Sequence, residues 1–181
     1  MSTATDDEPD PFSLLGLPVT FELDPEVLRQ RVLRLSLRLH PDRAPDPVTA
    51  ELQALELAAI NEAAHEVEND ERRAEALLRL LGGPAPSEDR TLPDGFLESI
   101  LDVRLELEEA VSVGDEAGKS KLQAWAEERR KQHRSTIAML FDSESESIDR
   151  VSLVSIRHEL NVWRYIERML LQLSEADRGS M

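Results

Sequence analysis

The chain contains 181 residues, of which 40% are hydrophobic, 32% are charged and 4% are aromatic. This composition is typical of a water-soluble protein with one or two small domains. The absence of cysteine excludes disulfides, thiolate metal sites and cysteine nucleophiles. The 37 acidic and 21 basic residues give a formal net charge of −16. Because a surface of that sign repels phosphate backbones, we expect no nucleic acid partner.

The sequence also predicts no association with a membrane. No apolar run approaches the roughly 18 residues that a membrane span requires. The first ten residues are acidic, unlike a secretory or mitochondrial leader. We therefore expect a protein of the reducing cytoplasm.

Helix-forming residues dominate the chain. Leu, Ala, Glu and Arg, which lose little rotamer freedom in a helix, fill long stretches between clusters of glycine and proline. Asp24 and Asp70 are candidate helix N-caps, and Pro25 suits the first helical position. The pattern predicts an all-α protein with helices over about residues 11–15, 24–39, 46–67, 70–81, 94–113, 115–141 and 147–175.

Glycine and proline also indicate the domain organisation. In the segment 82–86, two glycines end a helix and two prolines prevent its immediate restart. Short, polar connections between the last three predicted helices favour an antiparallel three-helix bundle. We predict a disordered N-terminus at 1–9, an N-terminal helical domain at 10–82, a linker at 83–93 and a C-terminal bundle at 94–177.

The helix predicted over residues 24–39 carries a cationic face. Arg31, Arg34 and Arg38 share one side of it, at spacings i, i+3 and i+7. From Val27 to Arg43 there are five arginines and one acid, which makes a +4 island in a chain of −16. Taken alone, this pattern is also compatible with simple solvation of an amphipathic helix. The apolar side of the same helix is formed by Leu28, Val32, Leu35 and Leu39.

The tripeptide His40-Pro41-Asp42 follows this helix at once. Pro41 disfavours helical geometry at His40, so the helix should end there and present the tripeptide in a loop. A cationic helix face, this tripeptide at its end, a short proline-rich loop and a second amphipathic helix together resemble a J-domain. J-domains stimulate ATP hydrolysis by chaperones of the DnaK class. The resemblance implies that the tripeptide engages such a chaperone and that the three arginines meet an acidic patch on it.

A second feature lies on the helix predicted over residues 94–113. Leu97, Leu101 and Leu105 form a stripe about 100° from the expected core face, and acids including Asp102 and Glu109 run beside it. Leaving a leucine in water forgoes roughly 1.5–3 kcal/mol of burial. The stripe therefore meets a neighbouring helix of the bundle, the N-terminal domain or a partner. The expected core face is formed by Phe96, Ile100, Val103, Leu107 and Val111.

The resemblance narrows to the HscB family of iron–sulfur cluster co-chaperones. Its signature stretches lie at residues 10–18, 21–24, 60–63 and 73–78, and it continues at Phe96-Leu97 and Arg104. It spans about residues 10–175 and implies an N-terminal J-domain, a helical hairpin with short flanking helices, joined to the C-terminal bundle.

The same resemblance assigns the leucine stripe to an IscU-type iron–sulfur scaffold protein. Leu97, Leu101, Asp102 and Glu109 match the family pattern. Leu105 stands where the family often has an acid, and Glu98 where it often has methionine. A further contact expected on the last helix falls near Val162 or Trp163, and we take Val162 as the candidate.

The implied function is that of a co-chaperone rather than an enzyme. It would stimulate the ATPase of a DnaK/HscA-class chaperone and deliver the scaffold to it. We expect no metal and no cofactor, because the four histidines lack metal-ligand spacing and no glycine-rich phosphate loop is present. Two alternatives stay open, namely a J-domain adaptor for a different client and a purely structural helical oligomerisation module.

Overall fold

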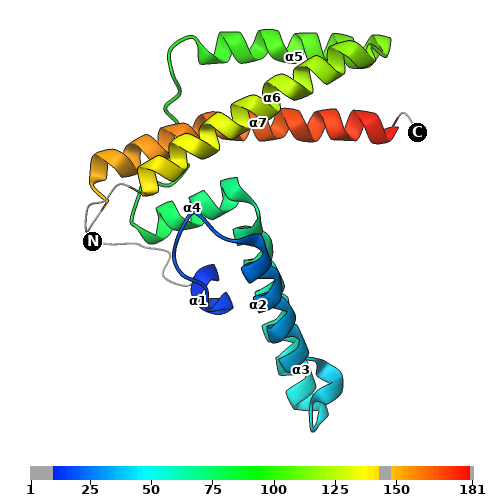
Figure 1. Ribbon diagram of the computed structural model, residues 1–181, viewed down its shortest axis with the longest axis vertical. Helices are drawn as coiled ribbons and strands as arrows, with labels where there is room; N and C mark the ends of the chain where they lie inside the picture. The colour runs from blue at the N-terminus through cyan, green and yellow to red at the C-terminus, as the bar shows by residue number, and fades with distance from the viewer. Residues whose placement is uncertain (1–9, 143–147, 180–181) are drawn as a thin grey trace. The chain divides into compact units, whose positions relative to one another are not determined.

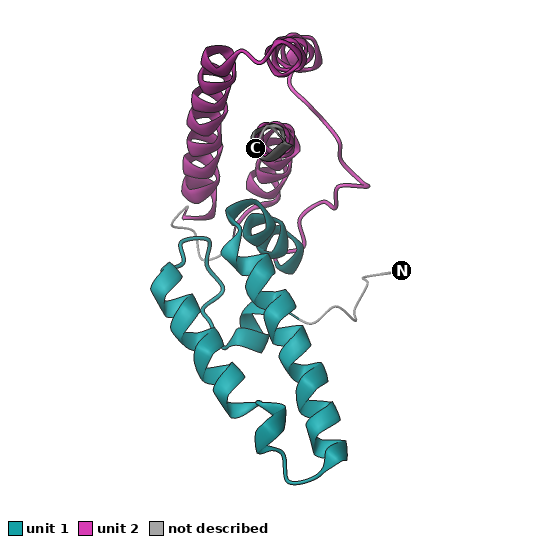
Figure 2. Ribbon diagram, turned by 90° about the vertical axis from the view of Figure 1, so that its right-hand side faces the viewer, with its two compact units in different colours: residues 1–80 teal, residues 81–181 magenta. Residues whose placement is uncertain are grey.

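A computed structural model describes residues 10–142 and 148–179 of the chain. Every regular element in those ranges is a helix. The chain divides into two compact units, unit 1 at Met1–Leu80 and unit 2 at Leu81–Met181 (Figure 2). The predicted all-α fold is therefore confirmed. Within the described ranges, no helix has the length and hydropathy needed to cross a lipid bilayer. The predicted disordered segment 1–9 lies outside the described residues.

Unit 1 is built on a hairpin of two helices, α2 (Pro25–Arg38) and α3 (Pro47–Glu68), which lie side by side in Figure 1. The short helix α1 (Pro11–Leu15) packs against both helices of the hairpin, and α4 (Asp70–Leu80) packs against α3. The buried side chains between them include Phe12, Leu15, Leu28, Leu35, Ile60, Val67 and Leu78. The elements of unit 1 are α1 (Pro11–Leu15), α2 (Pro25–Arg38), the 3-10 turn η1 (Pro41–Arg43), α3 (Pro47–Glu68) and α4 (Asp70–Leu80).

An aspartate followed by a proline begins each of the first three α-helices. Asp10, Asp24 and Asp46 accept backbone N–H groups of the first helical turn, and the proline after each occupies the first helical position. Proline fits there because that residue has no intrahelical partner for an N–H. Hydrogen bonds from the backbone and side chain of Thr49 lower the pKa of Asp46. The cap of α3 therefore persists at neutral pH and is lost only in acid, as pH falls through that lowered pKa.

Arg73 is a buried cation that joins three segments of unit 1. Its Nε donates to the Phe21 carbonyl at 2.7 Å, and its Nη1 donates to the Val67 carbonyl at 2.6 Å. Its Nη2 also pairs with the carboxylate of Asp70. The guanidinium lies 5.2 Å from the centre of the Phe21 ring. One side chain thus links the segment before α2, the end of α3 and the start of α4.

Unit 2 is an antiparallel bundle in which α6 packs against both other helices, most extensively against α7 (Figure 1). Glu167 of α7 accepts hydrogen bonds from Arg130 of α6 and from the Trp163 indole. The apolar core includes Ile100, Leu107, Leu122, Ile137, Ile156, Leu160, Trp163 and Ile166. The helices are α5 (Phe96–Val113), α6 (Glu116–Phe141) and α7 (Arg150–Gly179).

Three helix ends differ from the sequence-based expectation. The side chain that caps α4 belongs to Asn69, which accepts the Arg72 N–H, and Asp70 is already helical. Helix α5 begins at Phe96 rather than Asp94, because Gly95 has φ +74°, a left-handed conformation that cannot lie inside an α-helix. Helix α7 begins at Arg150 and extends to Gly179, beyond the predicted end. Its predicted start, residue 147, lies outside the described residues.

The segment predicted as a linker, residues 83–93, is anchored on α7. Arg157 Nε donates to the Pro84 carbonyl at 2.9 Å, and Asn161 Nδ2 donates to the carbonyls of Asp89 and Thr91. Both of these α7 side chains are buried. The segment is therefore part of unit 2 rather than an unattached connection.

We predict that Arg73→Met lowers the free energy of unfolding by about 2–4 kcal/mol, because it leaves two buried carbonyls without their donor. Urea unfolding followed by circular dichroism measures the change. The adjacent and exposed Arg72 provides the matched control, Arg72→Met, which should leave the midpoint nearly unchanged. Equal midpoints for the two variants would show that the Arg73 contacts contribute no stability.

Candidate partner-binding surfaces

The His40-Pro41-Asp42 tripeptide forms a tight turn at the end of α2. Leu39 closes the helix, and His40 is extended, at φ −63° and ψ 123°. Pro41 imposes this change because its ring clashes with a helical residue before it. The Asp42 N–H donates to His40 Nδ1 at 3.2 Å, and the Arg43 N–H donates to the His40 carbonyl at 2.9 Å. The expected loop is therefore an ordered 3-10 turn, capped by its own histidine.

The turn presents its polar side chains to solvent. The side chain of Asp42 is 88% exposed and that of His40 is 51% exposed. His40 Nδ1 lies 3.7 Å from the Asp42 carboxylate. Arg43, which we did not single out from the sequence, is also exposed, and its guanidinium donates to the Leu37 carbonyl of α2 at 3.0 Å. The turn is thus held by hydrogen bonds that each involve a backbone group, while its acid is exposed.

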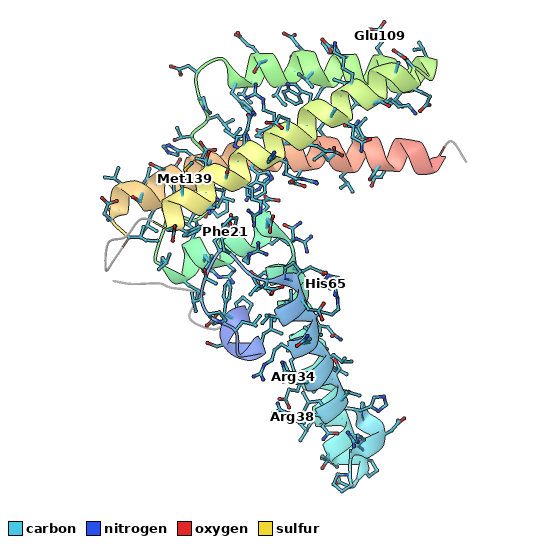
Figure 3. The ribbon with its side chains drawn as sticks, viewed as in Figure 1. Phe21, Arg34, Arg38, His65, Glu109 and Met139 are labelled. Carbon is cyan, nitrogen blue, oxygen red and sulfur yellow. The ribbon has the colours of Figure 1, made fainter. Side chains whose placement is uncertain are left out.

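The three arginines predicted to share one face have unequal environments. Arg34 and Arg38 are exposed and lie on the same side of α2 (Figure 3). Arg31 is only partly exposed, and its Nε donates to the Leu15 carbonyl at the end of α1. Its guanidinium occupies the space that a Cβ at Gly16 would need. Arg31 therefore joins α1 to α2, and Arg34 and Arg38 form the fully presented part of the cationic face.

Most of the apolar side predicted for α2 is buried. Leu28, Leu35 and Leu39 lie in the core, and Val32 is partly exposed. Two other leucines of α2, Leu33 and Leu37, are exposed. Each precedes one of the exposed arginines in sequence. The sequence analysis placed neither leucine on the apolar face or on the cationic face of α2, because their spacing does not fit either helical stripe.

The leucine stripe of α5 is exposed along its whole length. Leu97, Leu101 and Leu105 are 56%, 55% and 55% exposed, although Ile100 and Leu107 of the same helix are buried. The acids Asp102 and Glu109 are exposed on this helix as well, and Glu109 points away from the bundle in Figure 3. Neither neighbouring helix covers the stripe, so the structure presents it as an apolar surface edged by carboxylates.

Two predicted positions on this part of the chain differ in the structure. Val111, expected in the core, is exposed. Helix α5 packs less extensively on α6 and α7 than those helices pack on each other, so only a narrow side of it is buried. Val162 is only 8% exposed, and the adjacent Trp163 is fully buried. The Val162 side chain therefore offers little surface to a partner, and the exposed candidates on unit 2 all lie on α5.

Two histidines of unit 2 lie within hydrogen-bond distance of carboxylates. His133 Nδ1 lies 2.7 Å from Glu159, and His158 Nε2 lies 3.0 Å from Asp89. Hydrogen bonds from Thr91, with a smaller contribution from His158, lower the pKa of Asp89. In the part of the chain that the structure describes, no group of three or more histidine, aspartate or glutamate side chains could hold a metal ion.

The chain is similar to known co-chaperones along most of its length. No family model matches it. A co-chaperone protein HscB homologue from Bordetella pertussis is 31% identical over 170 residues, which cover 92% of this chain and 95% of that protein. A second HscB homologue, from Vibrio cholerae, is 39% identical over 107 residues, which cover 58% of this chain and 63% of that protein.

Solved structures show the same fold. Human co-chaperone protein HscB superimposes with a TM-score of 0.80 at 21% identity, over 96% of this chain and 85% of that chain. The chaperone HscB from Vibrio cholerae superimposes with a TM-score of 0.73 at 23% identity, over 96% of this chain and the whole of the other. The 31% identity to the Bordetella protein, over nearly the whole of both chains, shows that this chain belongs to the HscB family of co-chaperones.

Proposed function

We propose that this protein stimulates the ATPase of a DnaK/HscA-class chaperone and delivers an IscU-type iron–sulfur scaffold protein to it, which assists cluster assembly and transfer. The observation that carries the proposal is the ordered turn after α2, where Asp42 is held outward beside exposed arginines. Membership of the HscB co-chaperone family supports the same role. ATP hydrolysis would take place in the partner chaperone.

Charge explains how the chaperone would be approached. The chain as a whole carries −16, whereas Arg34 and Arg38 are exposed on the second half of α2 and Arg43 is exposed in the turn that follows it. Opposed charge patches accelerate association and fix orientation. Because an exposed ion pair contributes only about 0.2–1 kcal/mol, the complex should be weak and sensitive to salt.

Apolar burial would hold the scaffold. Leu97, Leu101 and Leu105 are more than half exposed, and Asp102 and Glu109 lie on the same helix. A partner that covered the leucines would remove apolar area from water, and the carboxylates would orient cationic groups at the rim. A chain that holds the scaffold on one unit and the chaperone on the other raises the effective concentration of one partner at the other.

Asp42→Asn should abolish stimulation of the chaperone's ATPase, because it removes the exposed negative charge of the turn. The fold should be unchanged, since the Asp42 side chain is 88% exposed. Single-turnover ATP hydrolysis by a DnaK/HscA-class chaperone measures the effect. Glu68→Gln, a neutralised exposed acid at the end of α3, is the matched control. Full stimulation by Asp42→Asn would exclude the turn as the chaperone-binding site.

Arg34→Ala combined with Arg38→Ala should weaken chaperone binding about 3- to 10-fold and reduce its salt dependence, with little change in stability. Arg31→Ala should instead lower the free energy of unfolding by about 1 kcal/mol, because it removes the hydrogen bond to Leu15. Titrations of ATPase stimulation at several salt concentrations, with urea unfolding of each variant, separate the two effects. If the double variant bound normally at low salt, the arginines would be only a solvated helix face.

Leu97→Ala combined with Leu101→Ala should weaken binding of an IscU-type scaffold by about 10- to 100-fold, because both side chains would be buried only in the complex. Isothermal titration calorimetry measures the affinity. Val151→Ala combined with Leu171→Ala removes two comparably exposed aliphatic side chains of α7 and should have no effect. Stimulation of the chaperone by the protein alone should be retained. An unchanged scaffold affinity would favour a different client or a structural role for the stripe.

A further inference from the structure

Two helices of unit 1 begin with the same kind of cap, in which the residue before a proline accepts the N–H of the residue after it. In both helices the capping residue is an aspartate, whose carboxylate is a strong acceptor for an N–H of the first turn. The two caps are Asp10 with the Phe12 N–H, at 3.0 Å across Pro11, and Asp24 with the Glu26 N–H, at 2.8 Å across Pro25.

The turn after α2 is capped in the same way, but by a histidine. His40 Nδ1 accepts the Asp42 N–H at 3.2 Å, across Pro41. The N–H groups of Arg43 and Ala44 donate to backbone carbonyls of the turn, and proline has no N–H. Within residues 41–44, His40 therefore satisfies the one N–H that the backbone of the turn leaves without an acceptor.

The direction of this hydrogen bond determines the state of the imidazole. A ring nitrogen accepts an N–H only when it carries no proton itself, so the cap requires a neutral imidazole with its proton on Nε2. Nδ1 lies 3.7 Å from the Asp42 carboxylate. An aspartate at position 40 would place a second carboxylate about as close to that of Asp42, and like charges repel at such a separation. Histidine supplies the acceptor without the negative charge.

The cap acts on the residue whose side chain the turn presents. The hydrogen bond holds the backbone of Asp42, and the side chain of that residue is 88% exposed. A group that is held in place before a partner arrives loses less entropy on binding than one that must first be ordered. The imidazole thus contributes to recognition through the position of Asp42.

We propose that His40 is a positioning residue, whose uncharged Nδ1 caps the Asp42 N–H and so sets the place from which the Asp42 carboxylate meets a partner. The effect on a chaperone rests on the function proposed above, whereas the cap is a property of the isolated chain. The proposal requires two things of residue 40, an acceptor within reach of the Asp42 N–H and the absence of negative charge.

Three substitutions in the full chain separate these two requirements. His40→Asn keeps a neutral acceptor, because asparagine caps as well as aspartate does. His40→Asp keeps the acceptor but adds a charge, and His40→Ala removes the acceptor. His65→Ala, which removes an exposed histidine of α3, is the matched control. Circular dichroism should show the same helix content in all four variants.

Nuclear magnetic resonance measures the cap without any partner. In the wild-type chain at neutral pH, the nitrogen chemical shift of His40 Nδ1 should be that of an unprotonated nitrogen. Exchange of the Asp42 amide with water should be about 3- to 10-fold slower in the wild type, His40→Asn and His40→Asp than in His40→Ala. The control should exchange like the wild type. A proton on Nδ1, or equal exchange in the wild type and His40→Ala, would overturn the proposal.

Single-turnover ATP hydrolysis by a DnaK/HscA-class chaperone measures the consequence. Stimulation by His40→Asn should lie within about 2-fold of the wild type, and that by His40→Ala and His40→Asp should be at least about 5-fold lower. Loss of stimulation by His40→Asn with its Asp42 amide still protected would overturn the proposal, because the imidazole would then act by touching the chaperone. Full stimulation by His40→Asp would overturn the requirement for an uncharged cap. Failure of the proposed function is seen separately, as full stimulation by Asp42→Asn, and it leaves the magnetic resonance test of the cap intact.

Discussion

The guanidinium of Arg73 is the contact on which the geometry of unit 1 depends. Its donors reach the carbonyls of Phe21 and Val67, and it pairs with Asp70. These groups belong to the segment before α2, the end of α3 and the start of α4. A buried arginine is tolerated only where hydrogen bonds and an opposite charge replace its hydration. Because the ends of α2 and α3 near Arg73 are joined in this way, the hairpin can project the turn at its other end.

At that other end, proline decides what is displayed. Pro41 stops α2, and the backbone then closes into a 3-10 turn whose hydrogen bonds are made by His40 and Arg43. The Asp42 side chain is 88% exposed, and its carboxylate lies 3.7 Å from His40 Nδ1. Because these hydrogen bonds involve backbone groups of the turn, the exposed carboxylate remains accessible to a partner. A binding motif is most precise when the groups that hold its backbone differ from the side chain that contacts the partner.

The distribution of charge divides the molecule into different kinds of surface. Exposed arginines lie on the second half of α2 and in the turn after it, while exposed acids accompany the leucines of α5. The net charge of the chain is −16, so its overall field repels an anionic partner. Exposed arginines can therefore attract such a partner only at short range. The leucine stripe differs, because its contribution to binding would come from removal of apolar area rather than from charge. The two units can therefore recognise chemically different partners.

Local signals in the sequence were sufficient for the elements and for much of the candidate site. Aspartate–proline pairs predicted where α2 and α3 begin, because capping and the fixed φ of proline act over only a few residues. The spacing of Leu28, Leu35 and Leu39 predicted a buried side of α2 for the same reason. The end of α2 before His40 followed from Pro41, because the proline ring restricts the residue that precedes it.

Contacts between residues distant in the chain were decided by tertiary packing alone. The spacing of Arg31 matches that of Arg34 and Arg38, yet Arg31 is bound to Leu15 because α1 folds back against α2. Val162 and Leu97 are both apolar residues on amphipathic helices, but one is buried and the other exposed. Arg157 and Asn161 of α7 bind carbonyls of residues 84–91, some seventy residues earlier in the sequence. Periodicity specifies which side of a helix is apolar, but only the position of its neighbours determines whether that side is covered.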